Sequence, residues 1–88
     1  MDWNGFFETS DIKILTYLHA KSEARYSDLE KNVVKTRSVL SVSLQDLTAR
    51  GLIDRMVEPS KPIQTRYKLS DKGKKIVQHL AEIRKLLE

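Results

Sequence analysis

Cysteine is absent from this chain of 88 residues, and its absence excludes disulfides, thiolate zinc sites and cysteine nucleophiles together. Apolar residues never run for more than two positions, whereas a helix that crosses a bilayer needs about 20. The opening Met-Asp-Trp-Asn also lacks the basic and apolar regions of a secretory signal. We therefore expect a cytoplasmic protein without a membrane partner, folded as one domain over residues 1–88.

Motifs of catalysis are missing as well. The chain has no H-E-x-x-H, P-loop, G-x-S-x-G or dinucleotide fingerprint, and its three glycines stand apart at positions 5, 51 and 73. Its two histidines, His19 and His79, have no set of metal ligands beside them. We predict neither an enzyme nor a metal or cofactor site, and no small-molecule effector site is evident.

Positive charge is concentrated in one quarter of the chain. Seven lysines and arginines and three acidic residues lie between Asp54 and Lys75, and this excess equals the whole net charge of +4. A local positive field attracts polyanions, and nucleic acid is the first partner to consider. The alternative is an ordinary solvated surface.

The first half of the chain has two predicted helices. Apolar residues at helical spacing predict the first over about residues 9–21. An extended link over residues 24–26, long enough for a short strand, follows. Ser27 and Glu30 then have the spacing of a capping box, which predicts a second helix that ends near Asn32.

A third helix is predicted over residues 36–50, with its first residue, a threonine, able to cap it. Leu40, Leu44 and Leu47 share one face at spacings of four and three residues. Gly51 stands where a helix usually ends with a left-handed residue. Because only a tight turn separates this helix from the second, the pair has the form of a helix-turn-helix.

A hairpin and a last helix complete the chain. Residues 52–58 and 64–69 have strand character, and Pro59 and Pro62 fit the loop between them. Ser70 can cap a final helix that runs to the C-terminus. The predicted fold is mainly α with a small β-hairpin (α+β), in the order helix, short strand, helix, helix, strand, loop, strand, helix.

This order resembles the winged helix-turn-helix transcriptional regulators of the HxlR type and, more loosely, of the MarR type. The motifs that carry the resemblance are Leu-Thr-Ala-Arg-Gly-Leu-Ile at 47–53, Pro62, and Tyr-Lys-Leu-Ser-Asp-Lys-Gly at 67–73. The resemblance itself extends from Tyr26 to Lys75, a little over half of the chain. The resemblance implies a sequence-specific, double-stranded DNA-binding regulator that acts as a homodimer. Residues 9–69 would form the DNA-binding core and wing, residues 70–88 the dimerisation helix, and residues 1–8 would join the interface.

Transferred residue by residue, the resemblance implies three groups of residues. The recognition helix would present to the major groove Thr36, Arg37, Ser38, Ser41, Val42 and Gln45. The wing would contact the backbone or minor groove with Arg55, Lys61, Gln64, Arg66 and Lys68. The homodimer interface would contain Trp3, Phe6, Phe7, Ile76, Leu80, Ile83 and Leu87.

Two of these assignments leave alternatives open. In the wing, Arg55 either joins the face that Gln64, Arg66 and Lys68 share or pairs with a neighbouring acidic residue. At the interface, the apolar seam of the last helix and the aromatic residues near the N-terminus could instead cover the core of a single chain. That helix, about 25 Å long at 1.5 Å per residue, is longer than so small a domain covers, which favours the dimer.

The recognition helix departs from the family in its charge. HxlR-like proteins tend to carry several arginines there, whereas Ser38, Val42 and Ser43 stand at those positions and Arg37 alone remains. The N-terminal cysteine of many HxlR-like proteins is also missing, so a thiol sensor is excluded. The weakly basic helix keeps a second function open, a winged-helix adaptor module that binds protein without reading DNA.

Overall fold

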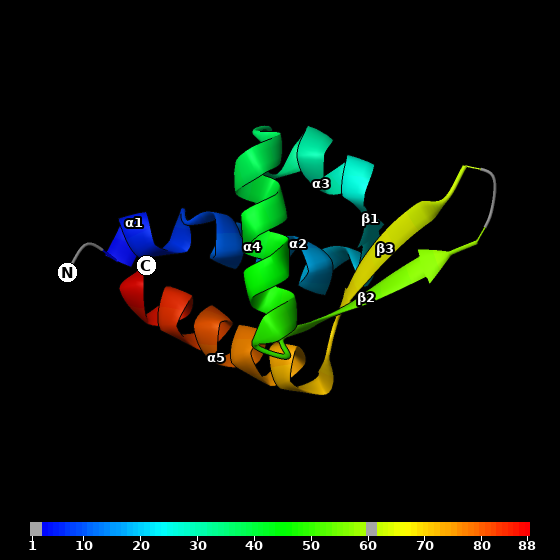
Figure 1. The fold of residues 1–88 in the computed structure, drawn as a ribbon. Coiled ribbons are helices and arrows are strands. Elements are labelled where there is room, and N and C mark those ends of the chain that lie inside the picture. Colours follow the sequence, from blue (N-terminus) through cyan, green and yellow to red (C-terminus); the bar gives the residue numbers. More distant parts are fainter. Residues whose placement is uncertain (1–2, 60–61) are drawn as a thin grey trace.

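Helices cover one face of a three-stranded antiparallel sheet, and two of its strands extend beyond them as a hairpin (Figure 1). The computed structural model describes residues 3–59 and 62–88, with side chains from Gly5 onward. In chain order the elements are α1 (Trp3–Phe7), α2 (Ser10–Lys21), β1 (Glu23–Arg25), α3 (Tyr26–Asn32), α4 (Arg37–Ala49), β2 (Ile53–Glu58), β3 (Gln64–Leu69) and α5 (Asp71–Leu87). The central strand β3 pairs with β1 on one side and with β2 on the other.

The predicted order of elements, and with it the winged helix-turn-helix class, is confirmed. The observed α2 and α4 lie within the predicted helices, and β3 has the predicted bounds. Gly51, with a φ of +74°, has the left-handed conformation expected after α4. Thr36 is the N-cap residue of α4, although its side chain makes no capping hydrogen bond.

The predicted capping box of the second helix is wrong. Because β1 ends at Arg25, α3 begins at Tyr26 and the third helical position falls on Asp28 rather than on Glu30. The Asp28 carboxylate accepts a hydrogen bond of 3.1 Å from the backbone N–H of Arg25, which satisfies one of the free donors around the helix start. Glu30 is thereby left for a contact with α4.

Helix α1 was not predicted, because five residues that include a glycine are too few to show a helical period. It brings Phe7, only 7% exposed, into the core. The guanidinium of Arg84, near the end of α5, lies 4.7 Å from the centre of the Phe7 ring, a cation–π distance. Helix α1 and the end of α5 consequently lie side by side (Figure 1).

The core lies between α2, α4, α5 and the inner face of the sheet, which is the face that carries Ala24, Tyr67 and Leu69. Its most deeply buried large side chains are Ile14, Leu15, Leu18, Leu29, Leu40, Leu47 and Ile53. Leu40 and Leu47 of the predicted leucine face of α4 are among them and Leu44 is also buried, so the opposite face of that helix is turned to solvent. In the described part of the chain, no helix is long and apolar enough to cross a membrane.

A tight corner joins the end of α4 to the start of α5. The Ser70 hydroxyl donates to the Gly51 carbonyl at 2.6 Å and accepts from the Gly73 N–H at 3.0 Å, as predicted for a cap. Gly73 is required here because a Cβ at this position would collide with the carbonyl oxygen of Leu52. The corner fixes the hairpin relative to α4. The surface between the hairpin and α4 contains the candidate functional site.

Candidate nucleic-acid interface

Helix α4 presents a face of small, mostly uncharged side chains. Its leucines at positions 40, 44 and 47 are 0–2% exposed and anchor it to the core. Ser38, Val42 and Gln45 are exposed on the other side, and Val42 keeps 66% of its surface. Such a face carries little electrostatic attraction of its own, as the sequence indicated.

Tyr26, which the sequence analysis did not single out, ties α3 to α4. Its hydroxyl lies 2.9 Å from the Ser41 hydroxyl and donates to the backbone carbonyl of Arg37 at 3.4 Å. Both bonds form when Ser41 is the donor in the first. Ser41 is half-buried beneath this contact, so its hydroxyl is engaged within the protein. In the sequence, Tyr26 falls in the extended link predicted before the second helix, and nothing there indicated this contact.

Arg37 is held by the helix before it but stays open to solvent. Its Nε donates to Glu30 Oε2 at 2.7 Å, while 78% of the Arg37 side chain remains exposed. The pair joins the short helix α3 to the first turn of α4. Exposed ion pairs of this kind contribute at most about 1 kcal/mol, so the guanidinium can exchange partners readily.

The two faces of the hairpin differ in whether their arginines form ion pairs. In the β2–β3 register Arg55 lies opposite Tyr67, and Met56 lies opposite Arg66. Partners across an antiparallel pair share a face, so Arg55 lies on the inner face with Tyr67, and Arg66 lies on the outer one. The prediction that Arg55 joins the face of Gln64, Arg66 and Lys68 is therefore wrong.

Arg66 is engaged by two carboxylates on the outer face. Its Nη1 donates to Glu23 Oε1 on β1 at 2.8 Å, and its Nε lies 2.7 Å from Glu58 Oε1 on β2. Only 28% of the Arg66 side chain is exposed. This arginine links the three strands. Its predicted phosphate contact would require at least one carboxylate to be displaced, which makes Arg66 a poor choice for the role.

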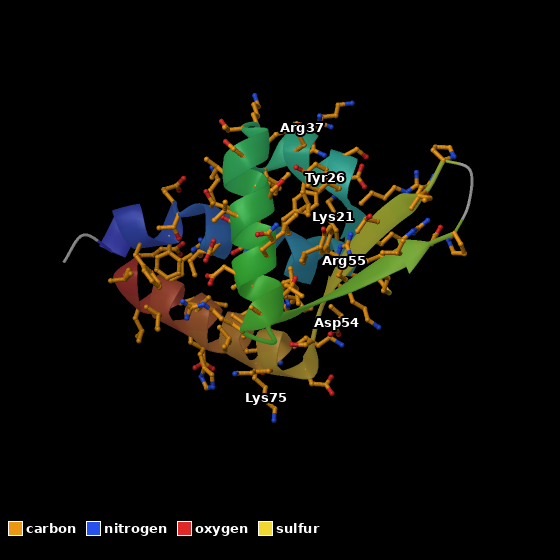
Figure 2. All side chains as sticks on the ribbon, in the orientation of Figure 1. Lys21, Tyr26, Arg37, Asp54, Arg55 and Lys75 are labelled. Atoms are coloured by element: carbon orange, nitrogen blue, oxygen red, sulfur yellow. The ribbon has the colours of Figure 1, made fainter. Side chains whose placement is uncertain are left out.

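A hollow of about 640 Å³ separates α4 from the inner face of the hairpin. It is lined by Tyr26, Ser41, Leu44, Gln45, Thr48, Ala49, Arg55, Thr65 and Tyr67. Figure 2 shows Arg55 between α4 and the hairpin, and Tyr26 on the same side of the molecule. Among the described residues Arg55 has no ion-pair partner, in contrast to Arg37, Arg50 and Arg66.

The remaining predicted wing residues are divided between surfaces. Lys61 lies outside the described residues. Gln64 is half-buried on the outer face, where Lys68 is exposed near the base of the hairpin, across the strands from Glu23 and Asp54. Of the wing residues that the structure describes, Arg55 alone thus lies toward α4.

The predicted dimer residues also divide into two sets. Ile76, Leu80 and Ile83 are partly buried against the core of their own chain, and Phe7 belongs to that core. For Phe7 the alternative of a cap on the single chain is therefore the correct one. Leu87 is 46% exposed and its neighbour Leu86 is 86% exposed at the end of α5, and Phe6 is 36% exposed in α1. The side chain of Trp3 is not among those described.

No group of three or more His, Cys, Asp or Glu side chains in the described part of the chain is arranged to hold a metal ion. The interface therefore consists of polar, apolar and cationic side chains. It comprises the outward face of α4, the contacts that Tyr26 and Glu30 of α3 make with α4, and Arg55 in the hollow.

The chain is similar to known helix-turn-helix proteins in both sequence and structure. The family model described as HxlR-like helix-turn-helix matches residues 10–88. The uncharacterized HTH-type transcriptional regulator YvaP of Bacillus subtilis is 31% identical over 75 residues, which are 84% of this chain and 69% of YvaP. The solved structure of ytcD, assigned as an HTH-type transcriptional regulator, has 26% identity and a TM-score of 0.74, over 98% of this chain and 92% of that one. A regulator assigned to the MarR family from Porphyromonas gingivalis shares the fold, with 22% identity, a TM-score of 0.69, and coverage of 96% and 86%.

Proposed function

The chain belongs to the HxlR-like helix-turn-helix family and is a transcriptional regulator rather than an enzyme, and from this we propose that it binds double-stranded DNA directly as a homodimer. In this proposal α4 enters the major groove, and a backbone strand lies in the hollow between α4 and the hairpin. The regulator acts on DNA in the cytoplasm, and no effector or cofactor is required for binding.

The observation that carries the DNA proposal is Arg55. It is a cation without an ion-pair partner among the described residues, in a hollow that the recognition helix also lines. Phosphate contacts position a protein on a duplex and supply most of its affinity. Thr48 and Thr65, which line the same hollow, add hydroxyl groups that can bind phosphate oxygens. Arg37, exposed at the entry of α4, gives a second contact once it leaves Glu30.

The homodimer is supported by the free end of α5. Leu86 and Leu87 expose apolar surface there, next to α1, and a second copy of the chain would bury it. Two recognition helices related by a twofold axis would then occupy successive major grooves, about 34 Å apart, on a nearly palindromic site.

The decisive measurement is fluorescence anisotropy of a labelled mixed-sequence duplex of about 30 base pairs, titrated at several salt concentrations. We expect binding in the micromolar range or tighter that weakens steeply as salt rises, because phosphate neutralisation releases counterions. Absence of binding at low salt would contradict the proposal and favour the adaptor function. Binding of a protein partner with an affinity that does not fall as salt rises would also favour the adaptor function.

Sedimentation equilibrium tests the dimer separately. We expect the wild-type chain to sediment as a dimer and the double variant Leu86→Glu/Leu87→Glu as a folded monomer, because four carboxylates would face each other across the interface. The matched control places the same substitution at Val57, which is half-exposed like Leu87 but lies in the hairpin. A Val57→Glu chain should remain dimeric. Wild-type chain that is monomeric at tens of micromolar would contradict the homodimer.

A further inference from the structure

The stripe of α4 that faces away from the core has an unusual composition for a surface that meets DNA. Ser38, Val42, Gln45 and Ala49 follow one another at spacings of three and four residues, so they share one face of the helix. All four are exposed. The stripe contains no lysine or arginine, and Arg37, the only cation within α4, belongs to the first turn and pairs with Glu30.

The chemistry of this stripe matches one kind of base pair. In the major groove guanine is read best by arginine or lysine, adenine by the amide of asparagine or glutamine, and the 5-methyl group of thymine by an apolar side chain. The stripe lacks the groups that read guanine. Gln45 and Val42 supply both groups that read an A·T pair, whereas the Ser38 hydroxyl does not discriminate.

Nothing within the described chain accounts for the exposure of Val42. Its side chain points away from the leucine face and keeps 66% of its surface, more than Val39 at 43%. Valine is also a weaker helix former than alanine at an exposed position. Ser41, the polar neighbour that could compete for the same base, is engaged by the hydroxyl of Tyr26. Val42 therefore stands as the apolar contact at the middle of the stripe.

Val42 and Gln45 are close enough to read neighbouring base pairs. Side chains three positions apart on a helix have Cβ atoms about 5–6 Å apart, and successive bases on a strand are about 3.4 Å apart. The amide of Gln45 is also the longer side chain, so it reaches over one further step.

We propose that α4 selects A·T base pairs at the centre of each half-site, with a thymine methyl group against Val42 and an adenine bound through N6 and N7 by Gln45. This inference rests on the proposed function, because it specifies which sequences the DNA-binding surface prefers. Arg37 and Arg55 supply affinity in this arrangement, and the uncharged stripe supplies specificity.

The test begins with selection of the preferred duplex from a random library by the wild-type chain. Each thymine of that duplex is then replaced singly by uracil, which keeps the base pairing and removes only the methyl group. We expect one thymine in each half-site whose replacement weakens binding about fourfold, the effect of leaving roughly one methyl group without its contact. Val42→Ala removes the contact in both half-sites of the homodimer, so it should weaken binding to the thymine duplex by about the square of that factor, roughly sixteenfold, and show no further loss on the uracil duplex.

Val39→Ala is the matched control, because it removes the same atoms from an exposed valine on the flank of the same helix. It should retain the full difference between thymine and uracil. Circular dichroism should show both variants as helical as the wild type, since alanine favours the helix.

The Gln45 contact has its own probe, 7-deazaadenine, which lacks the N7 acceptor. We expect its placement at one adenine to weaken wild-type binding about tenfold and to leave Gln45→Ala binding unchanged. Tight binding with equal affinity for thymine and uracil duplexes, or selection of G·C pairs at the half-site centre, would overturn the inference and leave the proposed function standing. Failure to bind any duplex would overturn both.

Discussion

The two faces of the hairpin carry the same kind of residue in opposite situations. On the inner face Arg55 opens into the hollow beside α4 without a carboxylate partner among the described residues, whereas on the outer face Arg66 lies between Glu23 and Glu58. The register shows why. Among the described residues of the three strands, the outer face collects three cations and three acids, and Arg55 is the only charged residue on the inner face. A cation in this sheet is more available to a polyanion where the neighbouring strands leave it without a partner than where two carboxylates hold it.

Of the substitutions that test this comparison, Arg55→Ala should have the largest effect, and the effect should be on the affinity for DNA. We expect affinity for every duplex to fall about tenfold or more at low salt, because a charge-assisted contact to phosphate is worth roughly 1.5–3 kcal/mol. The slope of log K against log salt should become shallower by about two, because each subunit of the homodimer loses one phosphate contact. Anisotropy titrations at several salt concentrations measure both quantities.

Two variants serve as controls for Arg55. Arg55→Lys keeps the charge and should therefore keep the salt slope. Lys75→Ala removes one charge from an exposed position on α5, far from the hollow (Figure 2), and should leave the slope nearly unchanged. Equal losses in Arg55→Ala and Lys75→Ala would mean that net charge, not the inner face, governs binding.

Arg66→Ala tests the other half of the comparison and should act on stability. The substitution leaves Glu23 and Glu58 without the cation between them, and we expect a loss of about 1–2 kcal/mol in the free energy of unfolding. Urea denaturation measures this loss, which should shrink in high salt because salt screens both the lost attraction and the new repulsion. The salt slope of DNA binding should stay as in the wild type. A slope shallower by about two, one phosphate contact for each subunit, would place Arg66 on DNA after all.

The sequence was sufficient to predict the helices and strands other than α1, but not which contacts their side chains make. Helical spacing located α2 and α4, and a serine and a glycine at helix ends located the corner with Gly51 and Ser70. These signals are local, since they depend on residues within one turn of each other. The face on which Arg55 lies depends on its pairing with β3, and a shift of one residue in register would reverse it.

Contacts between elements account for the other differences. Tyr26 was not assigned a role because its partner Ser41 is fifteen residues away, and no periodic pattern connects two such polar residues. Phe7 was assigned to a dimer because α1, which carries it into the core, is too short to be recognised. Charge counts could not show which arginine forms ion pairs with carboxylates either, because Arg66 and Arg55 have the same charge.

Tyr26→Phe should have a smaller effect, and it compares a neutral contact near the inner face with the ionic contacts of the outer one. Loss of the hydrogen bond to Ser41 should lower the free energy of unfolding by about 0.5–1 kcal/mol. Unlike the loss in Arg66→Ala, this one should be insensitive to salt, because neither hydroxyl is charged. Ser41→Ala should give a similar loss, and the double variant should add little to either. Fully additive losses would show that the two hydroxyls do not stabilise each other.

Glu30→Gln should have the smallest effect, and it concerns Arg37, which is paired like Arg66 but exposed like Arg55. Removing the carboxylate releases the guanidinium and one negative charge beside the entry of α4, while the glutamine keeps the size of the side chain. We expect DNA affinity at low salt to rise about two- to threefold, as an exposed ion pair worth less than 1 kcal/mol allows, and the gain to vanish at high salt. Asp46→Asn is the matched control, since it makes the same charge change in the exposed pair with Arg50 at the other end of α4. An equal gain in both variants would reflect net charge alone, whereas a gain confined to Glu30→Gln would show that pairing within the protein decides which arginines reach DNA.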